Sequence, residues 1–93
     1  MSQSSFSERL CIKNKRGLHA RASAKFVQTV DQFDADVQVS KDGHTVCGTS
    51  IMGLMMLAAA PGCHIDVVTS GNQAEDALKA ISTLIEDRFG EGE

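Results

Sequence analysis

The sequence has no Trp or Tyr, four Phe and a single Pro among its 93 residues. Proteins that bind single-stranded nucleic acid stack bases on aromatic side chains, and this chain has almost none to offer. Its nine Lys and Arg are outnumbered by twelve Asp and Glu, for a formal net charge of −3. That balance argues against a nucleic-acid groove or an anionic membrane surface as the partner, although it leaves room for a local basic site.

Long apolar runs and targeting patterns are also missing. No stretch approaches the roughly 20 apolar residues of a membrane-spanning helix, and the N-terminal segment lacks the basic and apolar regions of a signal peptide. The three cysteines, Cys11, Cys47 and Cys63, are odd in number, widely spaced and set in apolar runs, which favours free, buried thiols over a disulfide framework. We therefore expect a cytoplasmic protein without membrane insertion or disulfide bonds.

The residues that are present are close to a globular average, with 42% hydrophobic and 23% charged, which excludes a disordered or fibrous chain. A chain of this length buries roughly two-thirds of its unfolded surface, enough for one core built mainly from Val, Ile, Leu, Met and Ala. No linker, repeat or low-complexity segment divides it. We expect a single domain over residues 1–93, frayed at 1–5 and 90–93.

Apolar periodicity predicts seven secondary-structure elements, because strands repeat every two residues and helices at i, i+4 and i+7. Asp42-Gly43 between two β-like runs predicts a hairpin, since a type I′ turn needs positive φ at both central positions. Asn72, with Glu75 three residues later, resembles a capping box at the start of the last helix. In order, the predicted elements are strand 6–13, a helix after Gly17 that ends near Val30, strands 35–40 and 45–47, helix 51–59, strand 65–69 and helix 74–89.

This order, βαββαβα, closes most simply as a four-stranded, mainly antiparallel sheet with three helices on one face. The alternation of apolar and polar residues over 35–40 leaves the other face to water. The predicted fold class is therefore α+β, an open-faced sandwich.

Chemistry concentrates where the first strand joins the first helix. His19 falls at the helix start with Arg21 two residues on, where free backbone N–H groups and the positive end of the helix dipole gather. An anion on His19 would be held by those amides and by Arg21, while Gly17 would allow a tight turn beforehand. A neutral imidazole there is a competent phosphoryl acceptor. Spacing alone leaves open that His19 is a surface cap and Arg21 an exposed charge.

The predicted second helix has more apolar residues than a helix lying on one face of a sheet can bury. From Ile51 to Leu57 six of seven residues are apolar, whereas a helix lying on a sheet needs an apolar stripe only roughly 100° wide. One interpretation is burial on all sides; the other is an exposed, Met-rich surface that binds partners. The second places Leu54, Leu57 and Ala58 toward the core and exposes a docking patch of Ile51, Met52 and Met55.

Ser50 is a candidate cap for this helix. A phosphate on Ser50 would add charge beside the docking patch without unfolding the helix, and an unmodified capping serine is the plainer interpretation. His44 and His64 form no recognisable metal-ligand pattern with Cys47 or Cys63. We expect neither a metal nor another cofactor.

The sequence resembles the HPr family of bacterial phosphotransferase-system phosphocarriers in two motifs and in the spacing between them. The motifs are Gly17-Leu18-His19-Ala20-Arg21 and Ser50-Ile51-Met52-Gly53-Leu54-Met55. The resemblance extends over residues 8–89 and implies the family's open-faced β-sandwich. It implies that His19 accepts a phosphoryl group from phosphorylated enzyme I and donates it to enzyme IIA components. Arg21 would neutralise the phosphohistidine, and Gly17 and Ala20 would belong to the loop that holds the phosphate.

The resemblance also implies partners for the second helix. Ser50 matches the family's regulatory serine, which HPr kinase/phosphorylase modifies in lineages that have that enzyme, and Ile51, Met52 and Met55 match its docking patch. The chain departs from the family at Ala22, where many members have proline, and Arg16 adds a positive charge beside Gly17. Neither change removes a donor or a charge that transfer needs.

Three functions are weighed on this basis. The first is a monomeric, stoichiometric phosphoryl carrier, which is not an enzyme and binds no nucleic acid. The second is a regulatory binding module of a nitrogen-type phosphotransferase branch, signalling by phosphorylation state without sugar transport. The third, an α+β adaptor in which His19 is incidental, is disfavoured because both His19 and Arg21 are present. Lys15, Arg16 and Arg21 make the surroundings of His19 locally basic despite the net acidity.

Overall fold

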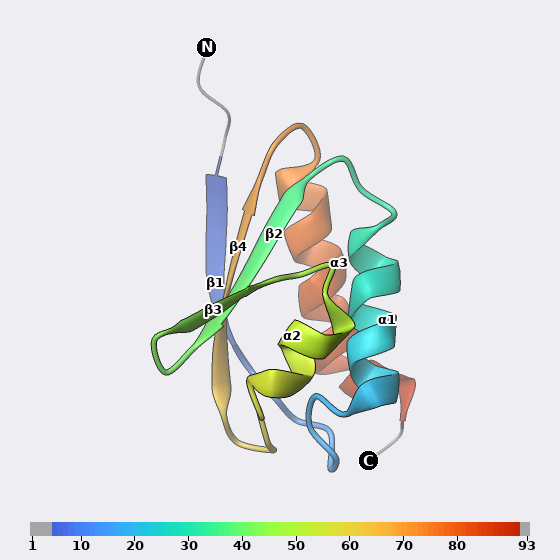
Figure 1. The fold of residues 1–93 in the computed structure, drawn as a ribbon. Helices are drawn as coiled ribbons and strands as arrows, with labels where there is room; N and C mark the ends of the chain where they lie inside the picture. The colour runs from blue at the N-terminus through green and yellow to red at the C-terminus, as the bar shows by residue number, and fades with distance from the viewer. Residues whose placement is uncertain (1–4, 92–93) are drawn as a thin grey trace.

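The computed structural model describes residues 5–91, which fold into one sheet backed by helices (Figure 1). A short 3₁₀ helix, η1, follows the last α-helix. In chain order the elements are β1 (Ser5–Cys11), α1 (Ala20–Val30), β2 (Asp36–Lys41), β3 (His44–Cys47), α2 (Ile51–Met56), β4 (His64–Ser70), α3 (Ala74–Glu86) and η1 (Arg88–Gly90).

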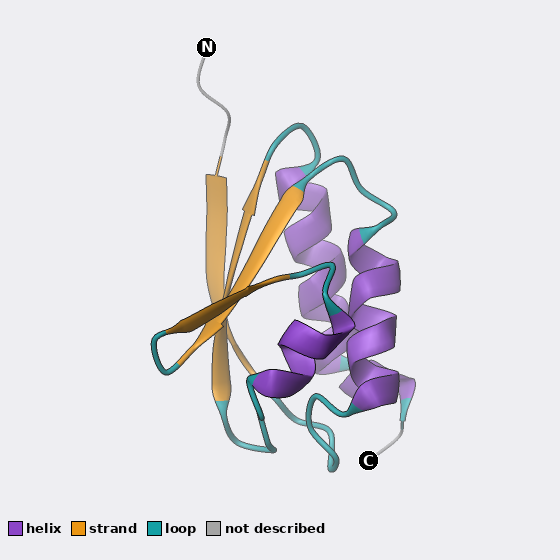
Figure 2. Ribbon diagram, in the orientation of Figure 1, coloured by secondary structure: helices purple, strands orange, loops and turns teal. Residues whose placement is uncertain are grey.

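The sheet has the strand order β1-β4-β2-β3, and every neighbouring pair is antiparallel. Figure 2 shows α1, α2 and α3 on the same side of the sheet, with the other face uncovered. The hairpin between β2 and β3 turns at Asp42 and Gly43, whose φ angles are 51° and 83°, as a type I′ turn requires. The predicted α+β open-faced sandwich and its hairpin are confirmed.

The core lies between the sheet and α1 and α3. Alternate residues of the strands point into it, which is the period-two pattern that the sequence shows. The buried face of α1 centres on Ala22, Phe26 and Val30. Fully buried strand and α3 residues include Val39, Ile65, Val67, Ile81 and Ile85.

Two predicted helix boundaries are wrong because the backbone turns left-handed. Helix α2 ends at Met56 and not near Ala59, since Ala58 has φ 54°. Helix α3 ends at Glu86, and Arg88 and Phe89 follow with φ of 53° and 55°. Phe89 is nevertheless fully buried, so it joins the core from the 3₁₀ turn instead of from the helix.

The predicted capping box at α3 is also wrong. The cap position is Gln73, which makes no capping side-chain bond. The Asn72 side chain donates instead to a carboxylate oxygen of Asp34 at 2.9 Å, and the Gln73 side-chain oxygen accepts from the Asp34 N–H at 2.7 Å. These residues tie the start of α3 to the loop between α1 and β2, because that loop lies beside them in the fold.

Fraying was expected at residues 1–5 and 90–93, and the described part of these segments is structured. Ser5 pairs with Ser70 in the sheet, Gly90 belongs to η1, and Glu91 contacts other side chains. Residues 1–4 and 92–93 lie outside the described residues.

All three cysteines are free, as expected, but they are not all buried: Cys11 and Cys63 are half-buried and Cys47 is exposed. Cys47 follows Val46 on the edge strand β3, and alternation turns it to the uncovered face. None of the helices described is both long enough and apolar enough to span a bilayer.

Candidate functional site

The loop that carries His19 is held against the segment after α2. Gly17 has φ 64°, and a Cβ atom there would overlap the carbonyl oxygen of Ala59. The Leu18 N–H donates to that same oxygen at 3.0 Å, and the Gly17 N–H donates to the Asn14 carbonyl at 3.2 Å. Glycine is therefore required at position 17 both by its conformation and by this close approach, and the tight turn expected there is confirmed.

His19 is the N-cap of α1. Its backbone is extended, its carbonyl accepts from the Ser23 N–H at 2.9 Å, and its ring Nδ1 accepts from the Arg21 N–H at 3.3 Å. The first N–H groups of a helix have no helical acceptor, and here they begin at Ala20. The Nδ1 lone pair thus faces the positive end of an 11-residue helix, where it accepts from the Arg21 N–H.

The other ring nitrogen of His19 faces Glu91. Nε2 lies 2.5 Å from the Glu91 Oε2, which makes a short, charge-assisted contact. Because Nδ1 accepts a hydrogen bond, the proton of the neutral ring is assigned to Nε2, which donates to the carboxylate. Glu91 is 72 positions from His19 in the chain and is absent from the predicted site residues, because residues 90–93 were expected to be frayed.

Asn14 completes the cluster. Its side chain is fully buried, and its Nδ2 donates to the Gly17 carbonyl at 2.8 Å and to the Glu91 Oε1 at 3.1 Å. Burial raises the pKa of Glu91, but the hydrogen bonds from His19 and Asn14 and the nearby charge of Arg16 outweigh this effect, so the pKa falls below its ordinary value. The Glu91 carboxylate therefore stays ionised beside the ring. Nothing in the sequence marks Asn14 except its place in a polar break.

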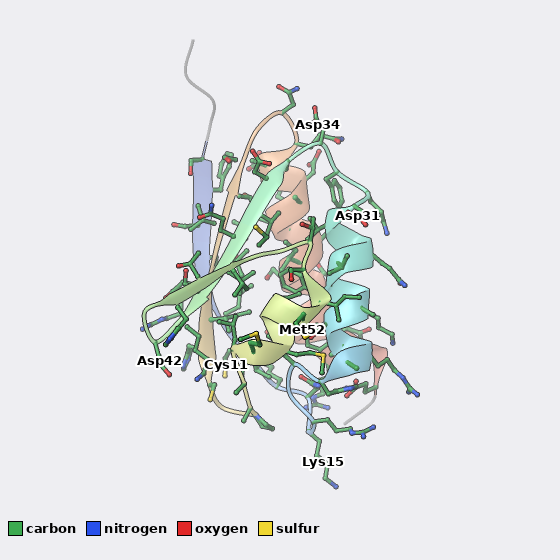
Figure 3. The ribbon with its side chains drawn as sticks, in the orientation of Figure 1. Cys11, Lys15, Asp31, Asp34, Asp42 and Met52 are labelled. Carbon is green, nitrogen blue, oxygen red and sulfur yellow. The ribbon has the colours of Figure 1, made fainter. Side chains whose placement is uncertain are left out.

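Arg21 lies two residues after His19 in the chain, but the ring contacts its backbone N–H and not its guanidinium. The residue is exposed, and within residues 5–91 its side chain forms no ion pair. Its backbone N–H is the part that meets His19. Figure 3 shows Lys15 extending from this end of the molecule, with Asp31 and Asp34 at the opposite end.

The docking patch is exposed as predicted: Ile51 is 41%, Met52 71% and Met55 42% accessible. Burial of α2 on all sides is therefore excluded. Leu54 and Leu57 face the core, as predicted, but Ala58 does not. Ala58 lies where the chain leaves the helix, so its side chain turns outward. The prediction also missed Met56, which is 77% accessible and extends the patch.

Ser50 caps α2, since its Oγ accepts from the Gly53 N–H at 2.9 Å, and it is partly exposed. A Cβ on Gly53 would lie 3.0 Å from that Oγ and from the Val46 Cβ, so this glycine lets α2 approach β3 closely. His44 and His64 are both exposed. Across residues 5–91, no three His, Cys, Asp or Glu side chains gather as a metal site.

Comparisons with known proteins cover most of the chain. The family model PTS-HPr, described as the PTS HPr component phosphorylation site, matches residues 6–87. Phosphocarrier protein HPr of Neisseria meningitidis is 55% identical over 82 residues, which are 88% of this chain and 92% of that protein. HPr-like protein Crh of Halalkalibacterium halodurans is 43% identical over 75 residues, or 81% and 89% of the two chains. The crystal structure of HPr-C-His from Thermoanaerobacter tengcongensis superposes with a TM-score of 0.89 at 43% identity, covering 92% of this chain and 97% of that one.

Proposed function

The chain belongs to the HPr family of phosphotransferase-system phosphocarriers, and from this premise we propose that His19 accepts a phosphoryl group from phosphorylated enzyme I and passes it to enzyme IIA components. The observation that supports this proposal is the state of the His19 ring. One nitrogen has its lone pair at the N-terminus of α1, and the other is occupied by a carboxylate. The ring can therefore act as a nucleophile through Nδ1.

In the accepting step the Nδ1 lone pair attacks phosphorus. The Nδ1–P bond forms while the bond from phosphorus to the donor's leaving atom breaks, and that atom keeps the electron pair. In the donating step the acceptor's nucleophile attacks the same phosphorus, and the electron pair returns to Nδ1. Each carrier molecule is regenerated without net change, so the protein acts as a stoichiometric carrier and not as a catalyst of its own.

The phosphoryl oxygens would lie where backbone donors are free. A group on Nδ1 would displace the Arg21 N–H from the ring, and the N–H groups that begin with Ala20 would donate to its oxygens. The helix dipole favours the negative charge. The exposed guanidinium of Arg21 would swing onto the phosphate once the phosphate is present, because no ion pair in the described residues holds it elsewhere.

Partners would bind through the docking patch and meet the phosphate at the same end of the molecule. The hydrogen bond from Leu18 to Ala59 joins the His19 loop to the chain that leaves α2, so a partner seated on α2 also reaches the ring. This carrier would work in the cytoplasm and as a monomer, since neither step needs a second copy. Phosphorylation of Ser50 by HPr kinase/phosphorylase would place charge at the edge of this surface.

The test is incubation with enzyme I and phosphoenolpyruvate, followed by intact mass. We expect an acid-labile adduct of one phosphoryl group on the wild type and none on His19→Ala. His44→Ala and His64→Ala are matched controls, because both remove an exposed histidine elsewhere, and both should keep the adduct. An adduct that persists in His19→Ala, or none on the wild type, would refute the carrier role.

A second candidate is a regulatory module of a nitrogen-type branch that signals by its phosphorylation state. The similarity to HPr-like protein Crh favours a regulatory role in general, as does the position of Ser50 beside the docking patch. The two functions differ in the acceptor. Transfer from the phosphorylated carrier to purified sugar-type and nitrogen-type enzyme IIA, followed by the loss of the mass adduct, shows which acceptor discharges it faster.

A further inference from the structure

We infer that Glu91 is a positioning residue for transfer at His19 and that Asn14 holds it in place. Together they keep the proton of the ring on Nε2 and leave Nδ1 as the nucleophilic nitrogen. The inference rests on the proposed function, because it assigns roles within that same transfer.

The contacts of the Glu91 carboxylate use both of its oxygens. Oε2 faces the His19 Nε2 at 2.5 Å and Oε1 accepts from the Asn14 Nδ2 at 3.1 Å. The Glu91 side chain is only 10% exposed and that of His19 only 20%, so water competes weakly for these bonds. Asn14 is fully buried and also binds the Gly17 carbonyl. One amide thus fixes the carboxylate and the loop that carries the ring.

The chain end is anchored before it reaches the site. Phe89 is fully buried in the core, and its carbonyl accepts from the Lys25 Nζ at 2.6 Å. Lys25 belongs to α1, the helix that His19 caps. Gly90 then turns the backbone with φ 73°. Glu91 lies two positions after the anchored Phe89, and its own N–H donates to the Arg88 carbonyl at 3.0 Å, so its backbone is held at the site.

The benefit to transfer follows from where charge develops. When Nδ1 attacks phosphorus, the ring still holds its proton on Nε2 and gains positive charge. The carboxylate at Nε2 stabilises that charge more strongly than it stabilises the neutral ring. When the phosphoryl group leaves, the electron pair returns to Nδ1 and the ring is again neutral with its Nε2 proton in place. No proton has to be exchanged with water in either direction.

The repulsion between Glu91 and a phosphoryl group is limited by the geometry of the ring. Nδ1 and Nε2 are directed to different edges of the imidazole, and the structure occupies them with an N–H donor and a carboxylate respectively. The same division of roles orients the histidine of a catalytic triad, in which a carboxylate holds one nitrogen so that the other can react.

The test compares Glu91→Ala and Glu91→Gln with Glu8→Ala. Glu8 is exposed on β1, so its substitution changes the net charge equally and serves as the matched control. The assay measures the kcat and KM of enzyme I with phosphoenolpyruvate and this protein as its substrate. We expect Glu91→Ala to lower that kcat about tenfold, the loss typical of one charge-assisted hydrogen bond. KM should stay within about twofold, because the docking patch is untouched. The kcat of Glu91→Gln should lie between those of the wild type and Glu91→Ala, because glutamine keeps a hydrogen-bond acceptor but loses the charge.

A spectroscopic signature separates positioning from a general loss of stability. In ¹⁵N-labelled wild type we expect a downfield, slowly exchanging Nε2 proton of His19, present in Glu8→Ala and absent in Glu91→Ala. Asn14→Ala should weaken this Nε2 proton signal and should also lower kcat, as Glu91→Ala does. An unchanged or faster kcat in Glu91→Ala, or an Nε2 signal that survives, overturns the inference while leaving His19 phosphorylation intact. Failure of the proposed function would instead abolish the adduct on the wild type itself.

Discussion

Substituting Gly17 by alanine tests whether the His19 loop needs its close approach to the segment after α2. Gly17 has φ 64°, and Gly43 in the hairpin turn has φ 83°. Both positions are left-handed, which costs an alanine about 1 kcal/mol relative to glycine. A Cβ on Gly43 would have nothing within 4 Å, whereas one on Gly17 would meet the backbone at Ala59 and Ala60. Gly43→Ala therefore isolates the conformational cost, and Gly17→Ala adds the steric one.

The steric cost is large because the obstructing atom is a backbone carbonyl oxygen that cannot rotate away. Moving the loop would break the hydrogen bond from Leu18 to Ala59, worth about 1 kcal/mol, and would loosen Leu18, which is only 4% exposed and contributes about 1.5 kcal/mol or more by burial. The sum for Gly17→Ala is about 3 kcal/mol or more, against about 1 kcal/mol for Gly43→Ala.

Thermal unfolding followed by far-UV circular dichroism is the appropriate assay, since the chain has no Trp or Tyr for fluorescence. For a domain of this size each kcal/mol lowers Tm by about 4–8 °C. We expect a loss of roughly 12–24 °C for Gly17→Ala and about 4–8 °C for Gly43→Ala. Phosphorylation of His19 should slow in the first variant and stay unchanged in the second. Equal losses of Tm in the two variants would refute the argument that the loop is locked on Ala59.

Two further predictions concern charge. Because folding lowers the pKa of Glu91, its carboxylate stabilises the fold at pH values above its ordinary pKa of 4.5, and this contribution is lost as the pH falls through the lower, folded value; Glu91→Gln should therefore flatten the fall of Tm with acidity, and an identical slope would contradict this. Ser50→Asp should weaken binding to enzyme I about tenfold, as measured by calorimetry, while the circular dichroism spectrum stays the same, because aspartate also caps helices. Undiminished affinity would remove the regulatory role of Ser50.

Local chemistry accounts for the parts of this protein that were predicted correctly. The Asp42-Gly43 turn and the Ser50 cap depend on residues at most three positions apart, so the sequence contains everything needed to infer them. The exposure of the docking patch could be predicted from the number of apolar residues in α2, which is larger than one buried helix face can hold. The predicted Asn72 cap is wrong because it depends on a distant residue: Asp34, 38 positions away, accepts the hydrogen bond from the Asn72 side chain.

The sequence by itself determined the order of the elements, the hairpin, the position of His19 at a helix start and the excess of apolar surface on α2, since each depends on residues near one another in the chain. Only the tertiary structure decided what surrounds the ring. Burial of Phe89 brings Glu91 to a histidine 72 positions away, and a buried Asn14 fixes it there. An acidic residue near the end of a polar tail has no local signal for this role, because the contact exists only once the core has formed.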